Sequence, residues 1–209
     1  VEKLNLQVKE AGLKGRIAIG HTRWATHGEP TKQNAHPHTC NNKRLTLVHN
    51  GIIENYATLK LKLEKEGYKF YSDTDTEVLV NWIHLFTKKH SSLIESVRMA
   101  LKDVVGAYAI LIADSQSDAI IAVKKSSPLC VGVGENEFII ASDATPVIPY
   151  TRNIVYLEDD QIAVIEGVEK GLTKMSIIDM DKNTIDPEIE NVTMELDSIE
   201  KGGYDSFML

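Results

Sequence analysis

The 209-residue sequence is poor in the features that mark several classes of protein. Its two cysteines, Cys40 and Cys130, are too few for a disulfide framework. No apolar run approaches a membrane span, because runs such as Ala107–Ala113 have only the length of a strand. No signal-peptide pattern opens the chain. The sequence therefore argues against a secreted disulfide scaffold and a membrane-spanning protein, and it favours the reducing cytoplasm.

The chain also lacks any concentration of positive charge. Its formal net charge is −7 and no basic patch stands out, which argues against a nucleic-acid partner. With 43% hydrophobic and 25% charged residues, it has the composition of an ordinary folded protein. The length suits one substantial domain or two small ones. The first residue is Val1 instead of methionine, so we expect that processing or truncation produced this end.

The first half of the chain has the pattern of helices with two short strands among them. Apolar residues recur at helical spacing, and Ser, Thr and Asn stand where helices would begin. The expected elements are a helix that stops at Gly12, strands at Arg16–Gly20 and Leu45–His49, a helix over Asn55–Glu66, and helices that begin at the capping boxes Thr74–Glu77 and Ser92–Glu95.

The second half of the chain has the pattern of short strands separated by turn-forming residues. Helices followed by hairpin-linked strands predict an α+β layered domain with largely antiparallel sheet. We expect one domain over residues 1–190 and a linker over residues 191–209, because hydrophobic periodicity fades from about Asp186. The expected strands are Ala107–Ala113, Ala119–Lys124, Leu129–Gly134, Phe138–Ser142, Ile154–Leu157, Gln161–Glu166 and Leu172–Asp179.

The densest group of chemically capable residues is the segment Gly20–Gly28, which reads GHTRWATHG. Arg23 offers a planar fork of donors that suits a carboxylate, and the hydroxyls and tryptophan beside it could complete a pocket for a small amino acid. The alternative, which residue types alone favour, is a polar loop whose arginine pairs with a nearby acidic residue. The histidines at positions 21, 27, 36, 38 and 49 match no common zinc spacing, so we expect them to hold the loop and to bind no metal.

Three further positions could carry chemistry. Asn50-Gly51 is typical of a tight hairpin turn, but a helical segment follows it. The alternative is an oxyanion hole, in which the Asn50 amide and the Gly51 N–H donate to a developing negative charge. Asp75, in the first turn of a helix, is explained by the helix dipole, and a carboxylate there could also receive an ammonium group.

Neither cysteine has the surroundings of a nucleophile. Cys40 lies in a polar loop without an identifiable orienting group, so we expect a plain thiol. Cys130 lies in an apolar strand, so we expect a core residue.

Seven segments, in order along nearly the whole chain, together resemble the glucosamine-6-phosphate synthase family, the glutamine–fructose-6-phosphate aminotransferases. Any one of these segments is a weak signal, but their joint occurrence is highly specific. The segments are Gly20–Pro30 (GHTRWATHGEP), Asn34–His38 (NAHPH), Val48–Asn55 (VHNGIIEN), Ser72–Glu77 (SDTDTE), Ser127–Leu129 (SPL), Ala141–Asp143 (ASD) and Lys201–Leu209 (KGGYDSFML).

The resemblance implies the fold of the N-terminal-nucleophile hydrolases, a four-layer αββα sandwich. It also implies a glutaminase whose N-terminal cysteine, with its own α-amino group as base, attacks the amide of glutamine, forms a thioester and releases ammonia. A sugar-isomerase half then uses the ammonia to convert fructose 6-phosphate to glucosamine 6-phosphate. No cofactor is implied, and the full-length protein is expected to be a homodimer.

By the same resemblance, several residues of the Gly20–Gly28 segment bind substrate. Arg23 would hold the glutamine α-carboxylate, and Thr26 and His27 would shape the loop around it. Trp24 would lie at the mouth of the ammonia path. The resemblance gives His36 only a structural role.

The remaining implied site residues are Asp75, which would hold the α-ammonium group, and Asn50 and Gly51, which would form the oxyanion hole. The chain departs from the family at its start, because Val1 corresponds to a point inside the domain and the nucleophilic cysteine is absent. We therefore expect this chain by itself to be inactive.

Two kinds of alternative stay open. Other amidotransferases share the domain, chiefly the phosphoribosyl enzyme of purine synthesis and asparagine synthetase. Trp24 and the tail Lys201–Leu209 favour the sugar-phosphate family over them. A non-catalytic amino-acid-binding module that has lost its nucleophile is the other alternative.

Overall fold

The computed structural model describes residues 2–12, 15–22, 28–167 and 173–193, and they contain four helices and eleven strands. The helices are α1 (Glu2–Ala11), α2 (Tyr56–Lys65), α3 (Asp75–Thr87) and α4 (Leu93–Leu101). The strands are β1 (His38–Thr39), β2 (Leu45–Ile53), β3 (Gly106–Asp114), β4 (Ala119–Lys125), β5 (Cys130–Val133), β6 (Phe138–Ala141), β7 (Asn153–Tyr156), β8 (Ile162–Gly167), β9 (Thr173–Ile178), β10 (Thr184–Ile185) and β11 (Glu190–Asn191).

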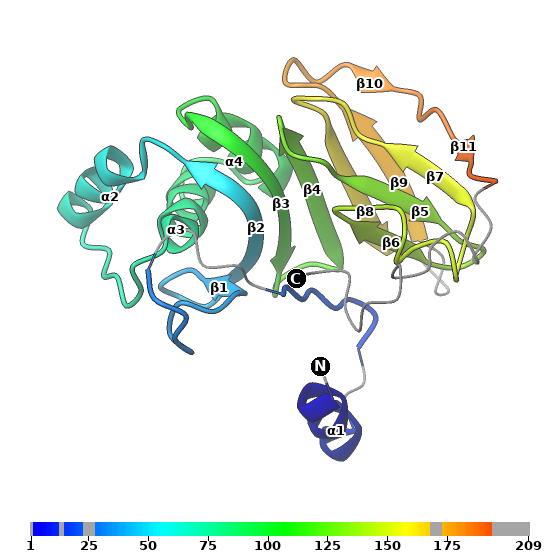
Figure 1. Cartoon of the computed structure of the whole chain (residues 1–209). Helices are drawn as coiled ribbons and strands as arrows, with labels where there is room; N and C mark the ends of the chain where they lie inside the picture. The colour runs from blue at the N-terminus through cyan, green and yellow to red at the C-terminus, as the bar shows by residue number, and fades with distance from the viewer. Residues whose placement is uncertain (1, 13–14, 23–27, 168–172, 194–209) are drawn as a thin grey trace.

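The strands form two sheets, and helices α2, α3 and α4 lie beside the larger one (Figure 1). The larger sheet has seven strands in the order β1-β2-β3-β4-β8-β9-β10, and the smaller has four in the order β11-β7-β5-β6. Every named strand pair is antiparallel. The α+β class and the antiparallel sheet expected from the sequence are confirmed.

Alternation along the central strands explains why the larger sheet is covered on both faces. On β4, Ile121 and Val123 belong to the core shared with the helices, whereas Ile120 and Ala122 belong to the core shared with the smaller sheet. Successive side chains of a strand point to opposite faces, so one apolar strand contributes to two cores. The structure therefore has a helical layer and two sheet layers.

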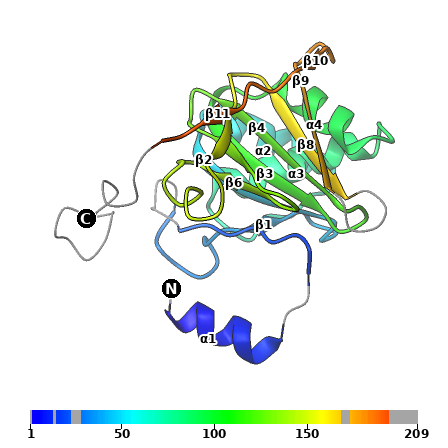
Figure 2. The ribbon, with the colours of Figure 1, turned by 90° about the vertical axis from the view of Figure 1, so that its right-hand side faces the viewer.

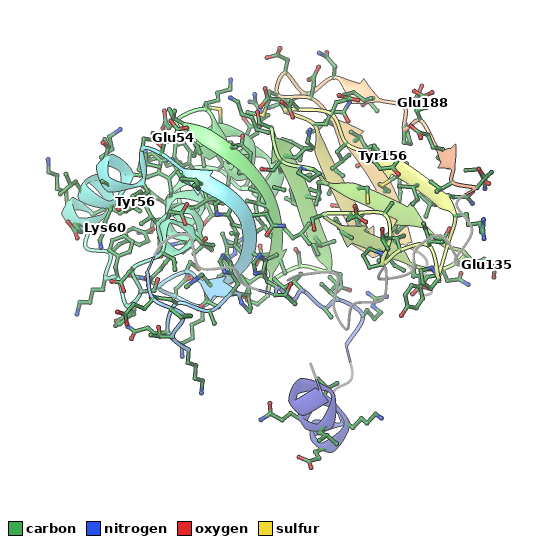
Figure 3. All side chains as sticks on the ribbon, in the orientation of Figure 1. Glu54, Tyr56, Lys60, Glu135, Tyr156 and Glu188 are labelled. Atoms are coloured by element: carbon green, nitrogen blue, oxygen red, sulfur yellow. The ribbon has the colours of Figure 1, made fainter. Side chains whose placement is uncertain are left out.

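The outer face of the smaller sheet has no helix over it among the described residues (Figure 1). A turn around Val147 and Ile148 packs on part of this face, and Tyr156 of β7 remains 44% exposed (Figure 3). Helix α1 lies away from both sheets in two perpendicular views (Figure 2). The described residues thus form three of the four layers that the αββα expectation contains.

Most of the expected elements are present, but three expectations were wrong. Residues 16–20 form no strand, because no described strand pairs with them; the Arg16 guanidinium instead pairs with Asp118, and Ile19 packs between the sheets. Asn50-Gly51 does not end β2, which continues to Ile53.

The third wrong expectation concerns the start of α2. Asn55 occupies the N-cap position but makes no side-chain cap. Its amide instead donates to the Asp103 carbonyl and accepts from the Val105 N–H. The two-residue strands β1, β10 and β11 are too short to give a sequence pattern, and the sequence did not predict them.

Candidate functional site

The Asn50-Gly51 pair lies inside β2, where it faces solvent. Asn50 pairs with Ala109 and Gly51 with Tyr108 in the ladder between β2 and β3. Gly51 has φ of 120°, and a Cβ atom there would lie 2.1 Å from the carbonyl oxygen of Ala107. Only glycine fits, because any side chain would collide with the neighbouring strand. Both residues are exposed, so the side-chain amide of Asn50 and the adjacent backbone of Gly51 are accessible on β2.

Asp75 is a buried carboxylate that joins α3 to the end of β2. Its side chain is fixed by the Ile53 N–H, which donates to Oδ2 at 2.8 Å, and by the Thr76 hydroxyl, 3.4 Å from Oδ1. Asp75 is 3% exposed. Ile53 is the last residue of the strand that carries Asn50 and Gly51, so this bond holds the three candidate residues in one local structure.

Within the described part of the chain, the negative charge of Asp75 has no lysine or arginine partner in an ion pair. The imidazole of His49 lies nearby, with Nδ1 3.9 Å from Oδ2 of Asp75, and it carries a positive charge only when it is protonated. The α3 N-terminus adds a partial positive charge. A buried carboxylate is stabilised fully only when it is paired, so this arrangement favours a bound cation at Asp75.

A cluster of histidines connects Asn50 to the start of α3. His21 Nε2 lies 2.5 Å from Asn50 Oδ1, and the His21 ring stacks on His36 with centroids 4.4 Å apart. His36 Nε2 and His49 Nδ1 both contact the Thr76 hydroxyl, at 2.9 and 3.1 Å. A hydroxyl has one proton, so at least one of these two rings donates to it.

The segment that follows residue 27 is held against the start of α3. Asn34 accepts from the Asp73 N–H at 3.0 Å, and its amide group donates to the Glu29 carbonyl at 3.1 Å. Gly28 has φ of 75°, and a Cβ atom there would lie 2.5 Å from Asn34 Nδ2. His38 Nε2 contacts the hydroxyl of Thr74, the residue that caps α3, at 3.1 Å. The polar segment is therefore anchored beside Asp75.

The two cysteines are buried and engaged, as expected for residues that are not nucleophiles. The Cys40 thiol donates to Asn42 Oδ1 and accepts from the Leu45 N–H. It is 1% exposed and lies in the core under the helices, not in an open loop. Burial raises the pKa of the Cys130 thiol to about 11, so it is protonated at neutral pH.

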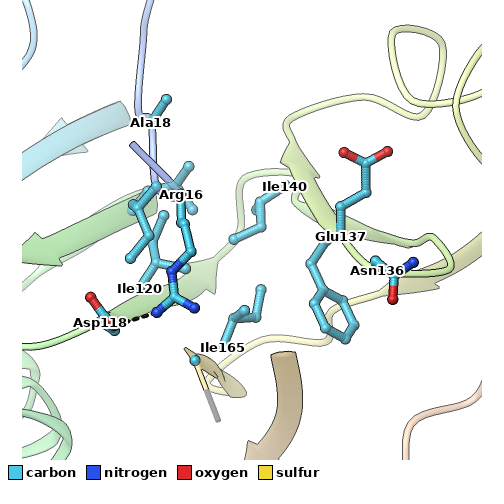
Figure 4. Close-up of a pocket in the computed structure, with 12 residues that line it drawn as sticks. Arg16, Ala18, Asp118, Ile120, Asn136, Glu137, Ile140 and Ile165 are labelled. Atoms are coloured by element: carbon cyan, nitrogen blue, oxygen red, sulfur yellow. Dashed lines mark hydrogen bonds and ion pairs between the residues drawn. The ribbon is translucent and has the colours of Figure 1, made fainter. Parts of the chain in front are cut away.

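A separate pocket of about 360 Å³ opens between the two sheets (Figure 4). Isoleucines 120, 140 and 165 line this pocket, together with Arg16 and Asp118, which form an ion pair. None of its lining residues belongs to the histidine cluster or to the Asn50–Asp75 region. This pocket is therefore distinct from the candidate site.

The structure brings together three of the predicted site residues, Asn50, Gly51 and Asp75. Residues 23–27, which include the other four, lie outside the described residues. Sequence reasoning gave no site role to Thr76 or His21, since a helix-start threonine and a loop histidine are explained equally well by structure. No group of three or more His, Cys, Asp or Glu side chains that could hold a metal occurs in the described residues.

Chemically, this region combines a group that stabilises a cation with groups that stabilise an anion. The buried carboxylate suits a primary ammonium group, and the exposed carboxamide of Asn50 suits a negative oxygen. A small zwitterionic amide has both features. No helix within the described residues is long and apolar enough to cross a lipid bilayer.

Comparison with protein families gives a match to a model described as a glutamine amidotransferase domain, over residues 21–148. Curated relatives match over nearly the whole chain. A glutamine–fructose-6-phosphate aminotransferase of Bacteroides thetaiotaomicron is 49% identical over 211 residues, covering 100% of this chain and 34% of its own length. The corresponding protein of Clostridium perfringens is 44% identical and covers 97% of this chain and 32% of its own length. The chain thus spans about a third of the length of these relatives.

Solved structures give the same fold. A glutamine phosphoribosylpyrophosphate amidotransferase from B. subtilis superposes with a TM-score of 0.61 at 27% identity, over 78% of this chain and 35% of that one. A second structure, of an allosteric regulatory enzyme of purine biosynthesis, has the same TM-score at 28% identity.

Proposed function

Because the chain belongs to the glutamine amidotransferase domain family, we propose that it is the glutaminase part of a glutamine–fructose-6-phosphate aminotransferase. In the full-length protein it would hydrolyse glutamine to glutamate and supply ammonia for the amination of fructose 6-phosphate to glucosamine 6-phosphate. Relatives of that name are 40 to 49% identical to this chain. The phosphoribosylpyrophosphate amidotransferase from B. subtilis reaches only 27%, which favours the sugar-phosphate reaction.

The observation that carries the proposal is the bond between the buried Asp75 carboxylate and the strand end that bears Asn50 and Gly51. Asp75 receives the α-ammonium group of glutamine. The Asn50 amide and the Gly51 N–H donate to the oxyanion that forms when the side-chain amide is attacked. The strand fixes the separation of the two subsites, so the reacting carbon is held at one place relative to both.

Other parts of the mechanism come from the family resemblance. Arg23 binds the α-carboxylate, Thr26 and His27 shape the loop around it, and Trp24 borders the path of ammonia. The family's nucleophile is an N-terminal cysteine with its α-amino group as base. The two cysteines of this chain are buried and are not that residue. We therefore propose that these 209 residues alone do not hydrolyse glutamine.

The broader setting is part of the same proposal. The domain would extend to about residue 190, where β11 (Glu190–Asn191) still pairs with β7, and a linker after it would lead to sugar-isomerase domains. The full-length protein would be a cytoplasmic homodimer that needs no cofactor for glutamine hydrolysis.

A glutaminase assay of the full-length protein tests this proposal, with glutamate release measured with and without fructose 6-phosphate. We expect release that fructose 6-phosphate increases. Replacing Asn50 with Ala should lower kcat by about 100- to 1,000-fold, with little change in KM. If kcat held and only KM moved, Asn50 would be a binding residue. Glutamine binding without any hydrolysis would favour the amino-acid-binding module instead.

A further inference from the structure

The contact between His21 and Asn50 determines which end of the Asn50 carboxamide faces outward. His21 Nε2 lies 2.5 Å from Oδ1 of Asn50. An amide oxygen can only accept a hydrogen bond, so Nε2 of His21 must carry the proton. The bond therefore engages the carbonyl end of the Asn50 side chain and leaves its NH₂ group for another acceptor.

This orientation matters because the two ends of a carboxamide have opposite effects on an oxyanion. The NH₂ end donates to a negative oxygen, whereas the carbonyl end repels it. The two orientations differ by a half-turn about χ2, a torsion with broad and nearly two-fold preferences. Asn50 is exposed, so packing does not select one of them. A fixed donor at His21 does.

His21 is itself held in place by the start of α3. Its ring stacks on His36 at an interplanar angle of 29°, and His36 Nε2 contacts Thr76 Oγ1 at 2.9 Å. Thr76 is 1% exposed and follows Asp75 directly. A continuous chain of contacts therefore runs from Asn50 through two imidazoles to the residue next to the carboxylate.

The two ring nitrogens of His21 have different surroundings. Its Nδ1 is buried and has no hydrogen-bond partner among the described residues. The contact with Asn50 therefore uses Nε2, the ring nitrogen for which a partner is present.

We propose that His21 is a positioning residue: it fixes the Asn50 carboxamide with its NH₂ group toward the oxyanion. This inference rests on the proposed function of Asn50. It predicts that His21 acts on the reaction step through Asn50, without touching glutamine.

The test is a double-mutant cycle in the full-length protein with the variants His21→Ala, Asn50→Ala and both together. His21→Ala should lower kcat by roughly 10- to 100-fold and change the glutamine KM by less than about threefold, because it removes only part of one oxyanion donor. In the Asn50→Ala background, His21→Ala should lower kcat no further, since residues that act as one unit are not additive. Independent effects that multiply would overturn the proposal.

A second variant separates positioning from a merely structural role. Glutamine can place an N–H donor near the position of the histidine Nε2, so His21→Gln should recover kcat to within about tenfold of the original. If His21→Ala fails to fold, the comparison of His21→Gln with the parent protein decides alone. A well-folded His21→Gln protein with kcat as low as that of Asn50→Ala would contradict the positioning role of His21. Absence of glutaminase activity in the unmutated full-length protein would instead reject the proposed function, so the two failures are distinguishable.

Discussion

Helices α3 and α4 begin with the same capping-box motif, but only the start of α3 belongs to the candidate site. In α3 the Thr74 hydroxyl accepts from the Glu77 N–H, and in α4 the Ser92 hydroxyl accepts from the Glu95 N–H. Both starts place a hydroxyl at the N-cap and a glutamate three residues later, which is the capping-box pattern. The cap alone therefore does not distinguish the two helices.

Burial of polar groups does distinguish them. The four residues that open α3, Thr74 to Glu77, are all 5% exposed or less. At α4, Ser92 is exposed and the next two residues are the apolar Leu93 and Ile94. Burying polar groups is unfavourable unless they are hydrogen-bonded, so α3 carries a network that helix formation does not require. These additional buried polar groups and their hydrogen bonds identify α3 as the helix of the candidate site.

The glutamate of each capping box also differs in its partners. Glu77 accepts from the backbone N–H groups of Tyr71 and Ser72 and from the Ser72 hydroxyl, so it shapes the segment before α3. Glu95 instead pairs with Arg98, which is 8% exposed, and with the exposed Lys182. The capping-box glutamate thus orders the backbone that precedes α3, whereas in α4 it forms ion pairs with two cationic side chains.

Among the changes that compare the two helices, the largest expected effect comes from neutralising the carboxylate of Asp75 in α3. Asp75→Asn keeps the shape of the side chain but removes its charge. We expect the glutamine KM of the full-length protein to rise about 10- to 150-fold, the loss of a charge-assisted contact of about 1.5–3 kcal/mol. Steady-state glutaminase kinetics measure this change.

The matched control for Asp75→Asn is Glu95→Gln, which neutralises a carboxylate in the first turn of α4. It should leave both kcat and KM within about twofold of the parent, since the partners of Glu95 are Arg98 and Lys182 and neither is a candidate site residue. An Asp75→Asn protein with unchanged KM would remove Asp75 from the ammonium subsite.

A smaller effect is expected from removing the two caps. Thr74→Ala should lower the local opening free energy of α3 by about 1–2 kcal/mol, and Ser92→Ala should lower that of α4 by about 0.5–1 kcal/mol. The difference arises because the Thr74 hydroxyl also contacts His38 and Ser72, whereas Ser92 is exposed. Hydrogen–deuterium exchange resolved to peptides measures each helix separately. Equal losses at the two helices would show that the extra contacts of Thr74 contribute nothing.

These two helices also show how far the sequence alone predicts the structure. Hydroxyl-x-x-Glu is a local signal, and both helices begin where it stands. The strands from residue 106 onward follow from alternation and turn residues, which are local as well. Local patterns therefore predict most of the described fold.

Contacts between distant segments were not predictable in this way. Residues 16–20 have the composition of a strand, but strand formation needs a partner, and pairing is a property of the whole sheet. The continuation of β2 through Asn50-Gly51 likewise depends on its partner β3. Thr76 joins two histidines from positions 36 and 49, and no spacing rule connects positions that far apart. The resemblance gave the roles of Asn50 and Asp75, and only the folded structure shows the contacts that run from Asn50 through His21 and His36 to Thr76.

The smallest expected effect is the dependence of the α4 start on pH. Hydrogen bonds from Arg98 and then from Lys182 lower the pKa of Glu95 from its ordinary 4.5 to about 2. A carboxyl group whose pKa is lower in the folded state stabilises the fold above its unfolded pKa, and this contribution is lost as pH falls from about 4.5 toward 2. Hydrogen exchange of the α4 peptides should therefore quicken over this range, relative to Glu95→Gln. Lys182 should contribute little, because it is exposed and solvent screens its pair with Glu95, so the effect should come mainly from Arg98. If Glu95→Gln had the same pH dependence of hydrogen exchange in α4 as the parent protein, other carboxylates would be responsible for that dependence.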